Sequence, residues 1–159
     1  MIKRIGLFTN ILKDPDLAVT MKIIDLMAKY SIEPVLTDTI AGRLNKIGYP
    51  QDEFASRSDC IIVAGGDGAV LRIVSDAMIY DKPMLSINLG RLGFLTEVES
   101  CDIDFALKNL VEERFYIEER MTLHAKTGQT DRYALNEIVI QRDTNGMIKI
   151  RLKIDGNAV

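Results

Sequence analysis

Short apolar runs alternate with helically spaced apolar positions over the first 113 residues of the sequence. The runs have the length of buried strands; they are Ile5 to Phe8, Pro34 to Leu36, Cys60 to Val63 and Pro83 to Ile87. Between them, apolar side chains recur three or four positions apart and predict helices; these are Leu17, Met21, Ile24 and Met27, then Val70, Leu71, Ile73, Val74, Ala77 and Met78, and finally Ile103, Phe105, Ala106, Leu107 and Leu110. Such alternation predicts an α/β fold, in which helices cover a parallel sheet.

Two of these predicted helices are preceded by start signals. Asp14 is followed by Pro15, and aspartate at the N-cap with proline at the first helical position is a favoured beginning. Ser100 or Asp102 can cap the last of the three helices in the same way.

The pattern changes at residue 114, where strand-like runs follow one another without helices between them. The runs are Phe115 to Ile117, Met121 to Ala125, Tyr133 to Ile140 and Met147 to Ile154. Thr127-Gly128 is a turn signal, and Asn145-Gly146 favours a type I′ hairpin. We therefore predict that residues 1–113 form a parallel α/β domain and that residues 114–159 begin an antiparallel, β-rich second domain.

The second unit contains few strands for an antiparallel sheet. Asp155-Gly156 is a further hairpin signal, but only residues 157–159 follow it. A sheet that stops at a turn leaves backbone groups without partners. We expect this part to be the front of a longer fold or to be covered by another chain, with a homo-oligomer through the β-rich part as the expected assembly.

Composition limits the partners and the compartment. Of the 159 residues, 47% are hydrophobic and 27% are charged, as in a globular protein without long disordered tails. The net charge of −3 argues against nucleic acid as the main partner, because binding its phosphates needs a basic face. The start MIKRIGLFTN has too short an apolar run for a signal peptide or a membrane span. Cys60, Cys101 and the lone His124 give no zinc-binding spacing, so we expect a cytoplasmic protein with reduced thiols and no membrane partner.

The glycine-rich stretch VAGGDGAV, residues 63–70, connects a predicted strand to a predicted helix. Gly65, Gly66 and Gly68 let a ligand approach the backbone because they carry no Cβ, and amides at a helix N-terminus favour phosphate. The stretch is not a P-loop, because no lysine followed by serine or threonine completes it. The dinucleotide-binding fingerprint is also missing, because Thr9 to Leu12 contains no glycine after the first strand.

Asp67 in this stretch has two interpretations of about equal weight. Its carboxylate could accept the proton of an attacking hydroxyl or hold a magnesium ion that shields phosphates. Alternatively, it is the N-cap of the following helix, a position that favours aspartate. Arg72 lies four residues beyond Gly68 on the same helix face, from which it could reach a ligand, or it is a solvated helix arginine.

Two later segments carry further candidates. Residues 88–96 follow a predicted strand, and Phe94 there could stack on a flat base or plug the core. Asn136 and Glu137 are adjacent polar residues within the apolar run from Leu135 to Ile140. In a strand they would point to opposite faces, so one enters a dry region unless a ligand meets it; alternatively, the strand is at an edge and Glu137 lies in water.

Taken together, GGDG at 65–68, Arg72, NLGRLGFL at 88–95 and LNEIVIQR at 135–142 resemble the NAD kinase family. The resemblance implies an N-terminal α/β domain that is Rossmann-like or phosphofructokinase-like, a β-rich C-terminal domain, and an active site between them. It implies transfer of a phosphoryl group from ATP or inorganic polyphosphate to the adenosine ribose 2′-hydroxyl of NAD, giving NADP. A divalent metal, magnesium, is expected with the donor.

The same resemblance assigns roles to single residues. Asp67 matches the proton acceptor, and Gly68 and Arg72 match positions that contact NAD. Phe94 matches an aromatic beside the adenosine, and Asn136 with Glu137 matches a pair that binds NAD.

The sequence departs from the family pattern at two places. Ala69 replaces a usual threonine and removes a hydroxyl near the phosphates, and the later family segment T-x-T-G-S-T-A-Y is not in the sequence. We therefore expect weak NAD binding and slow turnover by this chain alone. Two alternatives stay open: a lipid kinase of the diacylglycerol or sphingosine type, which shares the GGDG turn, and a non-catalytic NAD-binding or assembly module.

Overall fold

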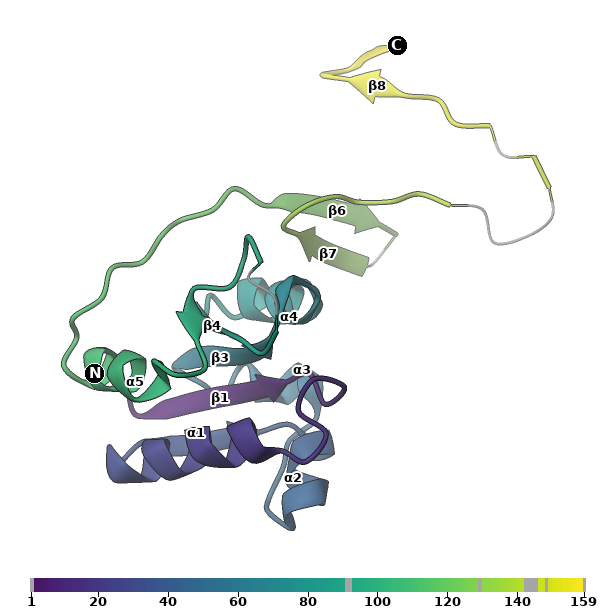
Figure 1. Cartoon of the computed structure of the whole chain (residues 1–159). Helices are drawn as coiled ribbons and strands as arrows, with labels where there is room; N and C mark the ends of the chain where they lie inside the picture. Colours follow the sequence, from purple (N-terminus) through teal and green to yellow (C-terminus); the bar gives the residue numbers. More distant parts are fainter. Residues whose placement is uncertain (1, 91–92, 129, 142–145, 148, 159) are drawn as a thin grey trace.

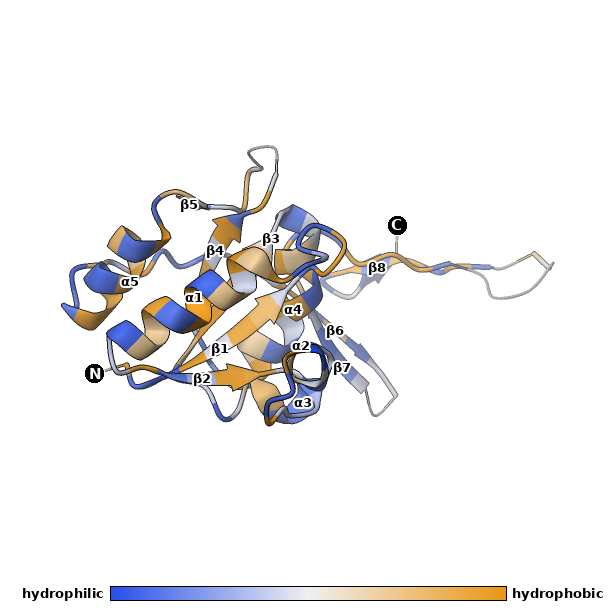
Figure 2. Ribbon diagram, turned by 60° about the horizontal axis from the view of Figure 1, so that its bottom comes forward, coloured by the Kyte–Doolittle hydropathy of each residue, from blue (hydrophilic) through white to orange (hydrophobic). Residues whose placement is uncertain are grey.

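A five-stranded parallel sheet forms the centre of the molecule. The structure is a computed structural model that describes residues 2–90, 93–128, 130–141, 146–147 and 149–158. The strand order is β2-β1-β3-β4-β5, and every neighbouring pair is parallel. Figure 1 labels β1, β3 and β4, and Figure 2 labels all five strands. The strands are β1 Arg4–Thr9, β2 Glu33–Leu36, β3 Cys60–Gly65, β4 Met84–Asn88 and β5 Val98–Glu99. The predicted parallel α/β fold is confirmed. The structure also contains β5, a strand of two residues that the sequence pattern did not predict.

Helices cover both faces of the sheet because strand side chains alternate between two apolar clusters. The helices are α1 Ala18–Lys29, α2 Asp38–Leu44, α3 Gln51–Phe54, α4 Asp67–Ile79 and α5 Ile103–Val111. In β3, Ile62 and Ala64 belong to the cluster with α1, α2 and α5, whereas Ile61 and Val63 belong to the cluster with α3 and α4. Figure 2 shows the apolar strands enclosed by these helices.

Helix α1 begins at Ala18, so the prediction that Asp14 is its N-cap and Pro15 its first residue is wrong. The Asp14 carboxylate nevertheless binds the first turn. It accepts hydrogen bonds from the Val19 amide at 3.2 Å, the Thr20 amide at 2.9 Å and the Thr20 hydroxyl at 2.7 Å. Asp14 is only 4% exposed, so these three donors replace the water that a buried carboxylate loses.

The buried faces of the helices are narrower than the apolar spacing predicts. Helix α5 begins directly after Asp102, one of its two predicted caps. Several residues assigned to buried faces are partly in water, namely Met21, Leu71, Met78 and Phe105 at 44%, 37%, 41% and 68% exposed. The sequence pattern did not predict α2 and α3, because seven and four residues are too few to show a helical period.

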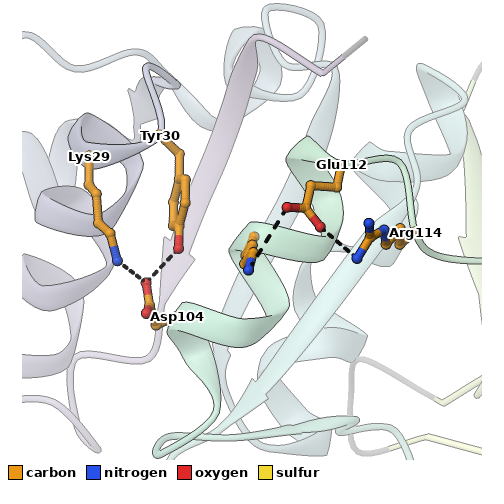
Figure 3. A network of polar contacts seen from close by, with 6 residues as sticks. Lys29, Tyr30, Asp104, Glu112 and Arg114 are labelled. Carbon is orange, nitrogen blue, oxygen red and sulfur yellow. Dashed lines mark hydrogen bonds and ion pairs between the residues drawn. The ribbon is translucent and has the colours of Figure 1, made fainter.

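Exposed polar contacts connect α1 to α5 (Figure 3). The Asp104 carboxylate accepts hydrogen bonds from Lys29 Nζ and from the Tyr30 hydroxyl, both at 2.9 Å. The bond from Lys29 is the main cause that lowers the pKa of Asp104, and the same bond raises the pKa of Lys29. Because both groups are half in water, they orient the two helices more than they stabilise the fold.

The C-terminal part contains two small antiparallel hairpins, as the turn signals predicted. They pair β6 Leu123–Thr127 with β7 Thr130–Ala134, and β8 Lys153–Ile154 with β9 Asn157–Ala158. In the second hairpin, Asp155 and Gly156 have φ values of 49° and 83°. Positive φ at both positions is what a type I′ turn requires.

Much of the predicted strand content beyond residue 114 is wrong. Phe115 to Ile117 is not a strand, the run from Tyr133 is a strand only to Ala134, and the run to Ile154 keeps only its last two residues. The predicted turn residue Asn145, together with 148 in the last run, lies outside the described residues. Many apolar side chains here are in water, including Tyr116 at 87%, Met121 at 90% and Met147 at 96% exposed. These runs therefore lack the covering layer that stabilises a strand.

Candidate functional site

Loops after three neighbouring strands meet at the carboxyl edge of the sheet. Strand β1 lies between β2 and β3, so the order of the strands reverses direction at the β1–β3 pair. Open α/β sheets bind ligands in the crevice that such a reversal creates. The glycine turn begins at the end of β3, and the Asn10 amide after β1 donates to the Ala64 carbonyl at 2.8 Å. The turn therefore lies at the position where this architecture binds ligands.

The glycines of the turn have different surroundings. A Cβ on Gly65 would lie 2.5 Å from the Ala69 Cβ, so a bare Gly65 is what lets α4 pack on the strand end. A Cβ on Gly68 would meet no other group within 4 Å. Gly65 therefore serves packing, whereas Gly68 leaves open space in which a ligand fits. Ala69, the departure from the family pattern, is only 2% exposed.

Asp67 contacts the loop after β4 instead of capping the helix. It is the first residue of α4, and Gly66 is the N-cap, so the N-cap interpretation of Asp67 is wrong. The Asp67 carboxylate accepts hydrogen bonds from the amides of Phe94 and Leu95, each at 3.0 Å. A Cβ on Gly93 would overlap the Asp67 carboxylate. The carboxylate thus fixes the loop beside the glycine turn, and glycine at 93 makes this approach possible.

Hydrogen bonds from side chains within residues 88–96 also stabilise this loop. The Asn88 side chain donates to the Gly90 carbonyl and accepts from the Gly90 amide, both at 3.0 Å. The Thr96 hydroxyl oxygen accepts from the Gly93 amide at 3.2 Å. Phe94 is 95% exposed, so the alternative that it plugs the core is wrong and its ring can contact a ligand. The middle of the loop, residues 91–92, lies outside the described residues.

Two adjoining cavities open beside α4, and Arg72 lines both. The larger has a volume of about 460 Å³ and extends to Tyr49, and the smaller has about 240 Å³ and includes Gly68. Phe8 and Asn10 of the first strand and its loop also line both cavities. Within the part of the chain that the structure describes, no carboxylate forms an ion pair with Arg72. Arg72 therefore adds a positive charge to the wall of both cavities.

Lys13 is a residue of this edge that the sequence analysis missed. A Cβ on Gly66 would lie 2.6 Å from Lys13 Nζ, and a Cβ on Gly90 would lie 3.2 Å from the same atom. The Lys13 ammonium therefore lies beside the backbones of the loops after β3 and β4, although Lys13 itself comes from the loop after β1. The only sign in the sequence that Lys13 belongs to the site is its position in the loop after β1. That position becomes informative once the strand order is known.

Asn136 and Glu137 lie beyond the end of β7 and are both exposed. The prediction that a strand carries one of them into a dry region is therefore wrong. Strand β7 itself approaches α4, where the Tyr133 amide donates to the Ser75 hydroxyl at 3.4 Å. Among the described residues, no hydrogen bond or ion pair joins Asn136 or Glu137 to the glycine turn. Their assignment to NAD stays a prediction.

The described ranges contain neither a metal-binding cluster nor a membrane-spanning helix. No three His, Cys, Asp or Glu side chains there gather closely enough to hold a metal ion. None of the helices in those ranges has the length and apolar character needed to cross a membrane.

The chain matches the ATP-NAD kinase N-terminal domain over residues 10–115. It is 34% identical to the NAD kinase of Caldanaerobacter subterraneus subsp. tengcongensis, over 99% of this chain and 59% of that protein. It is 36% identical to the NAD kinase of Ruminiclostridium cellulolyticum, over 99% of this chain and 58% of that protein. The chain thus spans little more than half the length of these relatives.

Two solved structures share the fold. The crystal structure of yeast NADH kinase complexed with NADH superposes with a TM-score of 0.71 at 16% identity, covering 85% of this chain and 47% of that one. The structure of an NAD kinase from Archaeoglobus fulgidus in complex with ATP superposes with a TM-score of 0.51 at 22% identity, covering 76% of this chain and 40% of that one. At these identities the likeness establishes the fold alone.

Proposed function

Because this chain belongs to the NAD kinase family, we propose that it supplies the catalytic aspartate and the front part of the nucleotide sites of an NAD kinase. The reaction transfers a phosphoryl group from ATP, or from polyphosphate, to the 2′-hydroxyl of the adenosine ribose of NAD. The observation that carries the proposal is the position of Asp67, at the carboxyl edge where the strand order reverses. The family match also favours NAD over a lipid as the phosphoryl acceptor.

Asp67 acts as the general base in the proposed reaction. The ribose 2′ oxygen attacks the terminal phosphorus of ATP, and its proton passes to the Asp67 carboxylate. A P–O bond forms while the bond to the bridging oxygen breaks, and ADP leaves with that electron pair. Each carboxylate oxygen accepts one amide hydrogen bond and retains a further lone pair for the incoming hydroxyl.

The remaining candidate residues bind the nucleotides around this base. We propose that Gly65, Gly66 and Gly68 bring backbone amides to the phosphates and that Arg72 supplies positive charge from the cavity side. Phe94 stacks on the adenine, which its 95% exposure supports. Asn136 and Glu137 bind NAD from the segment after β7, and this assignment rests on the family resemblance.

Magnesium enters this proposal together with the phosphoryl donor. The ion commonly keeps one or two carboxylate ligands and takes the others from substrate phosphates and water. Asp67 is the carboxylate at the glycine turn, and no cluster of three metal-binding side chains exists among the described residues. The residues present therefore fit an ion carried mainly by the nucleotide, where it neutralises phosphate charge.

We propose that residues 1–113 form one domain and that residues 114–159 begin a second, which contributes to a homo-oligomer in the cytoplasm. The family match ends at residue 115, close to that boundary. Exposed apolar side chains after residue 114 support a covering partner, and the unpaired Cys60 and Cys101 thiols support a reducing compartment. Light scattering on the purified chain tests the assembly: a mass of a single chain of 17.8 kDa contradicts the oligomer.

The function is tested with the full chain, NAD, ATP and Mg²⁺, with NADP detected by an NADP-specific dehydrogenase. Parallel reactions replace ATP by polyphosphate, NAD by NADH, or NAD by diacylglycerol vesicles. NADP formed above the enzyme-free blank supports the proposal. NAD binding by calorimetry without turnover indicates the non-catalytic module instead, and the absence of both binding and turnover contradicts the proposed function.

Substituting Gly68 by alanine separates ligand contact from folding. Because a Cβ there meets no group within 4 Å, Gly68→Ala is expected to leave stability unchanged or to raise it by about 0.5 kcal/mol. The methyl group occupies ligand space, so NAD affinity is expected to fall about tenfold.

Gly93→Ala is the matched control, because its Cβ overlaps the Asp67 carboxylate. That variant is expected to lose about 1–3 kcal/mol of folding stability. Calorimetry with NAD and urea unfolding measure the two quantities. Unchanged NAD affinity in a stable Gly68→Ala variant would contradict the assignment of Gly68.

A further inference from the structure

Lys13 is a cation at the edge of the sheet that has no acidic partner among the described residues. It belongs to the loop between β1 and α1, and its ammonium lies close enough to Gly66 and Gly90 that a Cβ on either would crowd it. No ion pair or hydrogen bond joins the Lys13 side chain to another group among the described residues. Lysine loses much side-chain entropy when it is held in one place. Lys13 itself is exposed, so its ammonium is accessible to an anion that would offset this loss.

A phosphate at the glycine turn needs a nearby cation, because the turn carries the negative charge of Asp67. The Asp67 carboxylate follows Gly66 directly and repels phosphate at short range. Arg72 lies on the cavity side of α4 with Gly68, whereas Lys13 lies at Gly66 and Gly90. Arg72 and Lys13 therefore lie at different parts of the turn, Arg72 near Gly68 and Lys13 near Gly66.

The position of Lys13 is similar to that of the lysine that binds phosphate in a P-loop. In a P-loop, a lysine of the glycine-rich loop itself reaches the terminal phosphates while backbone amides cradle the others. The turn at 65–68 has no such lysine in its own sequence. Lys13 brings an ammonium to the same kind of backbone from the loop of the neighbouring strand.

We propose that Lys13 binds the phosphate chain of the phosphoryl donor between the loops at Gly66 and Gly90. This inference rests on the proposed kinase function and assigns the donor, ATP or polyphosphate, to the Lys13 side of the turn. The acceptor NAD then lies on the side of Gly68 and Arg72. Lys13 orients the terminal phosphate and balances its charge, while Asp67 accepts the proton.

Calorimetric titration with inorganic tripolyphosphate, and separately with NAD, tests this assignment at constant ionic strength. The variants are Lys13→Met, which keeps the apolar stem without the charge, and Lys13→Arg, which keeps the charge. Lys46→Met is the matched control, because Lys46 is exposed and lines neither cavity. Thermal unfolding of each variant verifies that the fold is intact.

Lys13→Met is expected to weaken tripolyphosphate binding about tenfold, the usual effect of one charge-assisted contact. Lys13→Arg recovers most of the affinity, and Lys46→Met behaves as the wild type. NAD affinity is expected to stay within about twofold in all variants. Loss of NAD affinity with unchanged tripolyphosphate affinity would overturn the donor assignment, as would a wild-type chain that binds NAD but no tripolyphosphate.

Failure of the kinase function gives a different result. A wild-type chain that forms no NADP, while Lys13→Met still weakens tripolyphosphate binding, contradicts the proposed function and supports the role of Lys13 in phosphate binding. A chain that forms NADP with an unchanged KM for ATP in Lys13→Met supports the function and overturns the role of Lys13.

Discussion

Asp67→Asn is expected to lower the rate of NADP formation by about 100-fold to 10,000-fold, the usual contribution of a general base. Asparagine has nearly the same shape, but its amide does not take the proton of the ribose hydroxyl. The effect should fall on kcat more than on the KM for NAD, because the base acts in the transition state. Steady-state assays with NAD and ATP measure both parameters.

A control is needed because Asp67 also holds the loop that carries Phe94. Asparagine keeps one acceptor oxygen, so Asp67→Asn loses one of the two amide hydrogen bonds from Phe94 and Leu95. Thr96→Val loosens the same loop by removing the acceptor of the Gly93 amide, and it leaves the Asp67 carboxylate in place. We expect this variant to retain kcat within about tenfold and to raise the KM for NAD. Equal losses of kcat in both variants would show that Asp67 acts through the loop rather than as the base.

Asp14→Ala is expected to destabilise the fold by about 3 kcal/mol, because it removes the acceptor of two buried hydrogen bonds and one part-buried hydrogen bond. The donors are the amides of Val19 and Thr20 and the Thr20 hydroxyl, all in the first turn of α1. The loss also affects Thr9, whose hydroxyl forms a 3.0 Å hydrogen bond with that of Thr20 inside the protein. Urea unfolding followed by circular dichroism measures the change.

Asp14→Asn and Thr20→Val each remove one part of this hydrogen-bond network, so their costs can be measured separately. Asparagine keeps one oxygen acceptor, and valine removes only the hydroxyl, so each is expected to cost about 1–2 kcal/mol. Asp14→Ala with a loss below about 1 kcal/mol would contradict the structural role assigned to the carboxylate. Activity losses in these variants are expected to follow the fraction unfolded.

The sequence alone predicted the elements whose signal is local. The buried runs of β1, β3 and β4 and the spacing in α1, α4 and α5 lie within short windows, and the glycine turn follows its strand directly. The partners of Asp67 and the position of Lys13 depend on which strands are neighbours in the sheet. Strand order is a tertiary property, so no window of sequence contains it.

The strand predicted around Asn136 and Glu137 is wrong for a different reason. The apolar run from Leu135 to Ile140 predicts a half-buried strand, yet those residues lie mostly in water after β7 ends. Strand propensity reflects packing against a covering layer more than an intrinsic preference of the backbone. Residues 135–140 have no such layer in this chain, so their apolar character did not produce a strand.

The central place of β1 in the sheet affects how the protein folds while it is being synthesised. Strand β1 pairs on one side with β2, residues 33–36, and on the other with β3, residues 60–65, and both partners are synthesised after it. It cannot complete its hydrogen bonds until the glycine turn has been translated. Parallel pairing across such separations folds slowly, so we expect one edge of β1 to stay unpaired until β3 has been synthesised, and its apolar side chains to be open to aggregation during that time.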